Sequence, residues 1–125
     1  MRSMKNKYNA RKATRGGIVF SSKKELKRWQ ELEEMEKAGE ITNLQRQIKF
    51  KLLPAQYSKT ELTKNGRFKC IERECTYIAD FVYKDKQGNI HVEDAKGCKK
   101  GGAYNIFVIK RKLMLYMHGI RVEEV

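Results

Sequence analysis

The stretch YIADFVYKDKQGNIHVEDAKG, residues 77–97, joins two strand-like segments through a polar connection. Residues 77–83 are rich in aromatic and β-branched side chains, which favour a β-strand. Residues 84–89 are polar and contain a glycine, as in a hairpin connection, and residues 90–96 begin by alternating apolar and polar side chains. The stretch therefore predicts a β-hairpin whose second strand ends in two acids and a lysine.

The register of this hairpin decides which face each acidic side chain occupies, because side chains alternate along a strand. A three-residue loop, residues 86–88, with its glycine in the left-handed conformation, pairs Asp85 with Asn89. Counting back from that pair sets Asp80 opposite Asp94, with Cβ atoms about 5 Å apart on one face. A two-residue loop ending at the same glycine would instead put Asp94 on the opposite face.

Two carboxylates and a lysine on one face predict phosphodiester chemistry. Side-by-side carboxylates repel each other unless a cation neutralises them, and Mg²⁺ is commonly held by one or two carboxylates. Lys96 shares its face with Asp94 and could stabilise charge that develops on a phosphate or orient an attacking water. With Asp80 and Asp94 as metal ligands, the metal would polarise the phosphoryl group and activate its bound water.

The segments before the hairpin predict a helix and a strand. Ser22 and Glu25 have the S-x-x-E spacing of a capping box. Apolar residues then recur at helical spacing, so we expect a helix over residues 23–38. From Ile41 the helical period ends, and residues 47–52 alternate polar and apolar side chains before Pro54, which predicts a strand; a polar loop is expected from there through Gly66.

The segments after the hairpin predict a loop, a second helix and a short strand. Residues 97–102 are rich in glycine and lysine and are expected to form the loop. The second helix is marked by apolar residues at helical spacing, namely Ile106, Ile109 and Leu113, and it ends at Gly119. We expect this stripe, like Trp29 of the first helix, to face the core. A final short strand is expected over residues 120–125. The order helix, three strands, helix, strand predicts an α/β fold with a small mixed β-sheet flanked by helices.

The composition indicates a single domain with a polyanionic partner. The 125 residues suffice for one core, and 28 Lys+Arg against 15 Asp+Glu give a formal charge of +13, which favours nucleic acid as the partner. No apolar run is long enough to span a membrane, and the basic N-terminus lacks the apolar segment of a secretory signal, so we expect a cytoplasmic protein without membrane contact. The three cysteines form no CxxC pair, which predicts reduced thiols and no zinc site.

Residues 1–17 are polar and strongly basic, and we interpret them as a flexible N-terminal arm that precedes one domain over residues 18–125. Arg11, Lys12 and Arg15 would let this arm lie on phosphates. The alternative is an unstructured tail that only improves solubility.

The hairpin motifs resemble the signature of the PD-(D/E)XK nuclease superfamily. Ala79-Asp80 in IADF stands at the position of "PD", and Asp94-Ala95-Lys96 in EDAKG at that of "(D/E)XK". The S-x-x-E start of the first helix resembles the acidic helix of the phage Holliday-junction-resolving endonuclease I, which has a similar hairpin. Residues 18–125 as a whole resemble a small phage- and prophage-borne group of functionally uncharacterised proteins. The chain departs from the signature in having Ala79 for the proline and Asp94 for the commoner glutamate.

The resemblance implies a restriction-endonuclease-like αβββαβ core and a nuclease site. Mg²⁺ or Mn²⁺ would be held by Asp80, Asp94 and the backbone carbonyl of Ala95, with Glu25 assisting and Lys96 stabilising the transition state. It also implies branched or junction DNA as the substrate, in the cytoplasm of a host cell if the protein is phage-encoded. A homodimer would allow both strands of a junction to be cut.

Several residues near the expected site have a second explanation. A capping box requires a glutamate at Glu25 whatever the protein does. Glu93 is expected on the face opposite to Asp94, solvent-facing or paired, although another register would make it a ligand. The remaining candidates for phosphate contacts could equally be solvated, and they are Lys99 and Lys100 in the glycine-rich loop and Lys110 and Arg111 on the second helix.

Two other functions stay open. A non-catalytic nucleic-acid-binding module would keep the fold and the basic surface, since a fold by itself does not establish activity. A relative directed at RNA would use the same residues on a different substrate.

Overall fold

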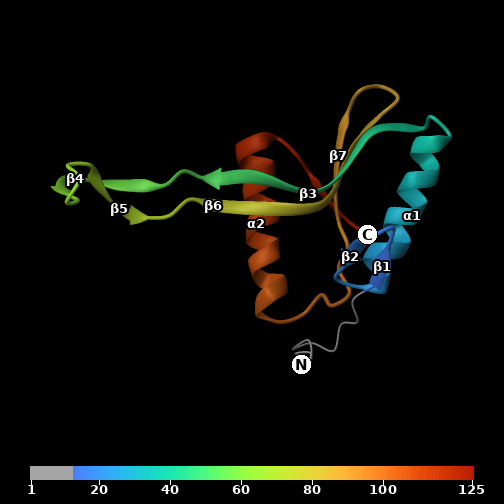
Figure 1. The fold of residues 1–125 in the computed structure, drawn as a ribbon, viewed down its shortest axis with the longest axis horizontal. Helices are drawn as coiled ribbons and strands as arrows, with labels where there is room; N and C mark the ends of the chain where they lie inside the picture. Colours follow the sequence, from blue (N-terminus) through green and yellow to red (C-terminus); the bar gives the residue numbers. More distant parts are fainter. Residues whose placement is uncertain (1–12) are drawn as a thin grey trace.

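A computed structural model describes residues 13–125 of the chain, which form a four-stranded mixed sheet with two helices (Figure 1). The strand order is β3-β6-β7-β8, where β3 pairs with β6 and β6 with β7 in antiparallel fashion, and β7 with β8 in parallel. The elements of this core are α1 (Lys23–Lys37), β3 (Ile41–Leu53), β6 (Cys75–Asp85), β7 (Ile90–Asp94), α2 (Gly102–His118) and β8 (Val122–Glu124). The expected α/β fold with a small mixed sheet flanked by helices is confirmed.

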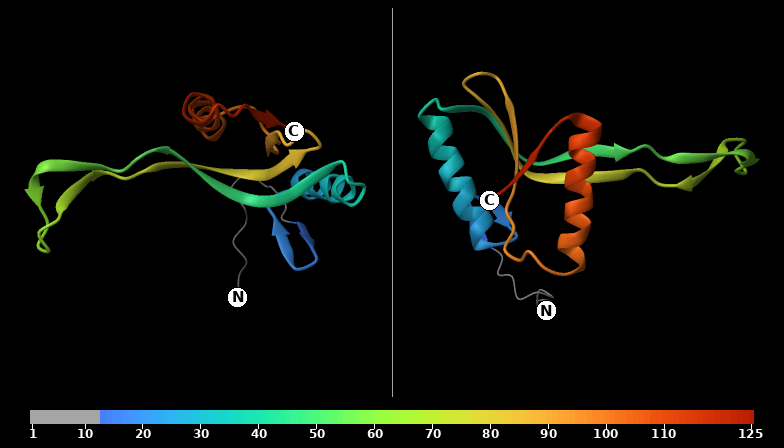
Figure 2. Two further views of the ribbon diagram at one scale, coloured as in Figure 1. Left: turned by 90° about the horizontal axis from the view of Figure 1, so that it is seen from above. Right: turned by 180° about the vertical axis from the view of Figure 1, so that it is seen from behind.

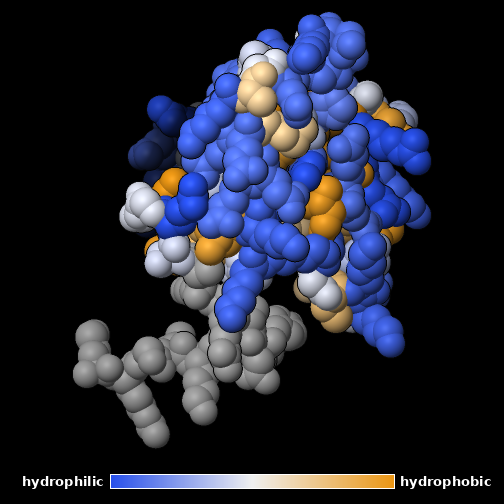
Figure 3. All heavy atoms as spheres, turned by 90° about the vertical axis from the view of Figure 1, so that its right-hand side faces the viewer, coloured by the Kyte–Doolittle hydropathy of each residue, from blue (hydrophilic) through white to orange (hydrophobic). Residues whose placement is uncertain are grey.

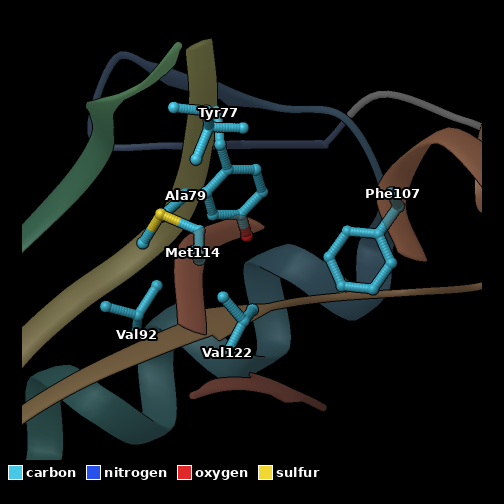
Figure 4. Packing of buried hydrophobic residues seen from close by; sticks show 7 residues of the cluster. Tyr77, Ala79, Val92, Phe107, Met114 and Val122 are labelled. Carbon is cyan, nitrogen blue, oxygen red and sulfur yellow. The ribbon is translucent and has the colours of Figure 1, made fainter. Parts of the chain in front are cut away.

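The two helices cover the sheet with separate hydrophobic clusters. The cluster under α1 contains Leu32 from the helix together with Phe81 and Tyr83 of β6, and Trp29 packs against it. The cluster under α2 joins the helix to β3, β6, β7 and β8, and the members labelled in Figure 4 are Tyr77, Ala79, Val92, Phe107, Met114 and Val122. Strand β6 contributes to both clusters, so the strand that carries Asp80 is held from two sides.

Helix α1 begins and ends with the caps that the sequence predicts. The Ser22 side chain accepts a hydrogen bond from the Glu25 amide at 3.2 Å, which satisfies one of the free donors of the first turn. At the other end Gly39 has φ 76°, and the Glu40 amide donates to the Met35 carbonyl at 2.9 Å, as in a Schellman motif. The expected helix is confirmed to within one residue.

Helix α2 ends at Gly119, with φ 67°, as expected, but it buries a different face from the expected one. Phe107 and Met114 are its buried residues, whereas Ile106 and Ile109 are 56% and 59% exposed. The prediction that this stripe faces the core is therefore wrong for Ile106 and Ile109, whereas its third member, Leu113, is half-buried and packs against the cluster under α2. The helix carries apolar side chains on two neighbouring faces, and periodicity alone could not decide which of them the sheet covers.

The region expected to be a polar loop through Gly66 contains a second hairpin, formed by β4 (Gln56–Leu62) and β5 (Phe68–Glu72). Both views of Figure 2 show it at the far end of the long β3–β6 ribbon, beyond α2. Nearly all of its residues are exposed, so no buried apolar face marks the strands in the sequence.

The segment before α1 contains a small hairpin. β1 (Ala13–Arg15) pairs with β2 (Ile18–Phe20), so the last part of the segment 1–17 that we interpret as a flexible arm is a strand and a turn. Arg11 and Lys12 lie outside the described residues. Neither helix of residues 13–125 is long and apolar enough to span a membrane.

Candidate active site

The β6–β7 hairpin has the three-residue loop that the sequence analysis required. The Asp85 amide donates to the Asn89 carbonyl at 3.0 Å, and the Gly88 amide donates to the Asp85 carbonyl at 3.0 Å. Gly88 has φ 84°, the left-handed conformation in which a side chain is strained. The alternative two-residue loop is thereby excluded.

The resulting register sets the two aspartates side by side. Val82 pairs with Val92 and Phe81 with Glu93. The next position along the two strands, one residue further from the loop, therefore sets Asp80 opposite Asp94. This confirms the predicted register. It also confirms that Glu93 lies on the opposite face from Asp94.

Asp80 is held by hydrogen bonds from both neighbouring strands. Its Oδ2 accepts from the Ala95 amide at 2.9 Å, and its Oδ1 accepts from Gln47 Nε2 at 3.3 Å. Burial, together with the negative charge of Asp94, raises the pKa of Asp80 from 3.8 to about 7. The two carboxylates therefore form an electrostatically costly pair that a cation would relieve.

Asp94 is 4% exposed, and a phenol and an ammonium group hold its two oxygens. Tyr77 donates its hydroxyl to Asp94 Oδ2 at 2.6 Å, and Lys96 Nζ lies 2.9 Å from Asp94 Oδ1. The same Lys96 ammonium stands 4.1 Å from the centre of the Phe107 ring, a favourable cation–π distance. Burial and the Asp94 carboxylate raise the pKa of the Tyr77 hydroxyl, so Tyr77 remains a donor.

Glu25 is buried at the start of α1, and its carboxylate contacts two side chains, while the helix cap is made by the Ser22 side chain. Glu25 accepts from Ser21 Oγ and from Arg46 Nη2, the latter at 3.2 Å, and is only 2% exposed. Its charge contributes to the raised pKa of Asp80, so the two groups interact electrostatically. The capping role of Ser22 explains where the helix begins and leaves the burial of the Glu25 carboxylate unexplained.

The oxygen donors at the end of the hairpin fit a hard divalent cation. The two carboxylates, together with the predicted backbone carbonyl of Ala95, are the ligand type that Mg²⁺ and Mn²⁺ prefer. Within residues 13–125, however, no group of three or more His, Cys, Asp or Glu side chains lies close enough to hold a metal ion. The structure thus brings Asp80 and Asp94 together and does not bring Glu25 into the same set.

A cavity of about 280 Å³ lies beside Asp94 and gives access to the site. Its lining includes Asp94 and Lys96, Tyr77 and Phe107, and the helix residue Lys110. Among residues 13–125, Lys110 is therefore the one proposed for nucleic-acid contacts that borders the same cavity as Asp94.

The other basic candidates in the described part of the chain do not line this cavity, although two of them contact Glu124, which pairs with Asp94 across β7 and β8. Lys99 Nζ and Arg111 Nη1 both contact Glu124, at 3.3 and 2.7 Å, at the β8 edge of the sheet. Lys100 is exposed in the loop before α2, and Arg15 pairs with Glu33 of α1 at 3.1 Å. Figure 3 shows the side of the molecule toward α1, where hydrophilic residues dominate the surface.

Two contacts of the site could not be established from the sequence. Tyr77 lies in the predicted strand, but only the packing of β6 against α2 shows that its hydroxyl reaches Asp94. Gln47 lies on β3, whose register with β6 cannot be counted across the long segment between those strands. Glu93 is paired, as one of the two expectations had it, but it is 1% exposed and so does not face solvent.

Replacing Asp80 by asparagine is expected to remove a pH dependence of stability. The Asp80 carboxyl has a higher pKa in the folded state, about 7, than its ordinary value of 3.8, so the folded protein binds this proton more tightly than the unfolded chain. Stability should therefore fall as pH rises from about 4 to about 7, by up to about 4 kcal/mol in the absence of divalent cations. Urea unfolding at pH 4.5 and pH 8 with a chelator would measure this: the wild type should lose more stability than Asp80→Asn, and equal losses would contradict the assignment.

Comparison with known proteins places the chain in a family. No curated protein and no solved structure matches it. A family model described as a protein of unknown function, DUF1064, matches residues 5–122 of the 125-residue chain. The chain therefore belongs to the DUF1064 family of proteins of unknown function.

Proposed function

We propose that this protein is a metal-dependent DNA endonuclease of the PD-(D/E)XK type. The observation that carries the proposal is the hairpin register, which sets the buried Asp94 beside Asp80 and leaves Lys96 in contact with Asp94. A pair of adjacent carboxylates, one buried and one half-buried, is costly to fold, and a catalytic metal site is a common reason for such a cost. A lysine beside the pair adds the cation that phosphodiester hydrolysis needs near the reacting phosphate.

In this proposal Asp80, Asp94 and the carbonyl of Ala95 hold Mg²⁺ or Mn²⁺, and Glu25 supports the site electrostatically from α1. The bound metal would polarise the phosphoryl group and lower the pKa of a coordinated water. Asp94 is held in place by the Tyr77 hydroxyl at 2.6 Å, and Asp80 by the Ala95 amide at 2.9 Å.

The contacts of Lys96 hold its ammonium group in a fixed position beside Asp94. Its ammonium is held between Asp94 Oδ1, at 2.9 Å, and the Phe107 ring, and its backbone carbonyl accepts a hydrogen bond from Lys24 Nζ at 2.7 Å. From this position it would donate to a non-bridging oxygen of the scissile phosphate or orient the attacking water. Because these contacts exist before substrate binds, little reorganisation is needed at the moment of reaction.

The proposed substrate is branched or otherwise structured DNA in the cytoplasm of a host cell. The formal charge of +13 supports a polyanionic partner, and Lys110 borders the cavity at Asp94. Lys99, Lys100 and Arg111 would then contact flanking phosphates, as would Arg15 and the N-terminal residues Arg11 and Lys12. Two copies acting together would cut both strands of a junction.

The experiment that tests the function compares cleavage by the wild type and by Lys96→Ala. Supercoiled plasmid, linear duplex and a four-way junction are incubated with Mg²⁺, with Mn²⁺ or with a chelator. The wild type should cut only with metal and should prefer the junction. Lys96→Ala should cut about 10²- to 10³-fold more slowly, because it removes one preorganised stabilising group.

The matched control is Lys84→Ala, which removes an exposed lysine from the same hairpin, away from Asp94. It should cut at the wild-type rate. If the wild type binds junction DNA as tightly as Lys96→Ala and neither cuts, the protein is a non-catalytic nucleic-acid-binding module. Cutting of RNA junctions in preference to DNA would assign it to the RNA-directed class.

A further inference from the structure

Gln47 has a backbone conformation that its strand does not require. It lies in the middle of β3 with φ 53°, in the left-handed region that residues with a side chain rarely adopt. Asn43, with φ 57°, also has a positive φ, but it lies at a β-bulge, where the register shifts between Thr42 and Gln45.

The register of β3 against β6 does not shift at Gln47. Arg46 pairs with Phe81 and Ile48 pairs with Ala79, so the register is the same before and after it. No bulge, turn or strand end explains the left-handed residue. A strained residue that the surrounding structure maintains points to a local role for its side chain.

The side chain of Gln47 reaches the candidate site. Gln47 stands opposite Asp80, midway between the two flanking pairs, and its Nε2 donates to Asp80 Oδ1 at 3.3 Å. The other oxygen of Asp80 accepts from the Ala95 amide at 2.9 Å. Asp80 is thus oriented from β3 on one side and from the end of β7 on the other.

The chemical type of the donor matters as much as its position. A carboxamide donates a hydrogen bond without adding a charge, so it fixes the orientation of the Asp80 carboxylate and leaves the negative charge available to a cation. The neighbouring Arg46, by contrast, carries a positive charge and forms an ion pair with Glu25 at 3.2 Å. Of these two adjacent residues of β3, Gln47 thus binds Asp80 without adding a charge, and Arg46 binds Glu25 with one.

We propose that Gln47 is a positioning residue for the metal site, an inference that rests on the proposed function. Its left-handed backbone aims the carboxamide at Asp80 and holds the carboxylate in the orientation that binds the cation. Groups that orient a metal ligand in this way typically contribute 10- to 100-fold to metal affinity.

The test measures Mn²⁺ binding to the full chain without DNA, by isothermal titration calorimetry, together with the melting temperature of each variant. Gln47→Ala should bind Mn²⁺ about 10- to 100-fold more weakly than the wild type. Gln47→Gly should bind as weakly as Gln47→Ala but melt at a higher temperature, because glycine accepts the left-handed conformation. The matched control is Gln45→Ala on the same strand, where the carboxamide contacts Asn43 and not an acid; it should bind Mn²⁺ like the wild type.

The outcomes separate this inference from the proposed function. If the wild type binds Mn²⁺ and Gln47→Ala binds it equally well, the positioning role is wrong and the metal site stands. If affinity follows the melting temperature, so that Gln47→Gly recovers wild-type binding, Gln47 acts only through stability and the inference is again overturned. If the wild type binds no Mn²⁺, the proposed function fails, and the inference fails with it.

Discussion

Replacing Asp94 by asparagine is expected to abolish metal-dependent DNA cleavage, with a loss of at least about 10³-fold in rate. Partners that only orient a metal ligand contribute about 10- to 100-fold, so a carboxylate that binds the metal directly should contribute more. The variant should still fold, because asparagine keeps an acceptor for the Tyr77 hydroxyl and removes the repulsion with Asp80. Single-turnover cleavage of a four-way junction in Mn²⁺ measures the effect.

The matched control for this substitution is Asp85→Asn in the same hairpin. Asp85 binds His91 and the amides of the connecting loop, so its loss should lower stability without touching the candidate site. Asp85→Asn should therefore cleave at close to the wild-type rate at a temperature where both proteins are folded. Cleavage by Asp94→Asn within about 10-fold of the wild type would contradict the assignment of Asp94 as a metal ligand.

The second large effect is on stability and concerns the opposite face of the hairpin. Glu93 is 1% exposed, and Arg28 of α1 binds both of its oxygens, at 2.7 and 2.8 Å, while the Tyr83 hydroxyl donates to one of them. Arg28→Met would leave a buried carboxylate without its cation, which costs about 3–5 kcal/mol. The melting temperature should fall by more than about 10 °C.

Two further variants define the source of this loss. Glu31→Gln removes the exposed partner of Arg28 and should cost less than about 1 kcal/mol. The double variant Arg28→Met/Glu93→Leu should recover much of the stability, because it removes both charges together. A change below about 1 kcal/mol in Arg28→Met would show that the buried pair does not hold α1 to the sheet.

The hairpin and the first helix could be predicted because local chemistry determines them. The glycine at position 88 and the polar segment before it predict a short loop of two or three residues, and the three-residue loop that forms sets Asp80 against Asp94. In the same way Ser22 determines where α1 begins.

The parts that could not be predicted depend on contacts between distant segments. The exposed β4–β5 hairpin has no buried face, so burial imposes no alternation of apolar and polar residues on its sequence. Helix α2 has two apolar faces, and only its packing on the sheet decides which of them is buried. The bonds from Tyr77 to Asp94 and from Gln47 to Asp80 likewise require a tertiary arrangement that strand periodicity does not contain.

The most direct test of the proposed metal site is the position of Mn²⁺ in crystals of the wild-type protein, located by anomalous scattering. We predict an ion bound by the carboxylates of Asp80 and Asp94 and by the carbonyl of Ala95. Lys96 should remain beside the ion without binding it. An ion bound elsewhere, or no ion in crystals grown at millimolar Mn²⁺, would contradict the claim that these two aspartates form a metal site.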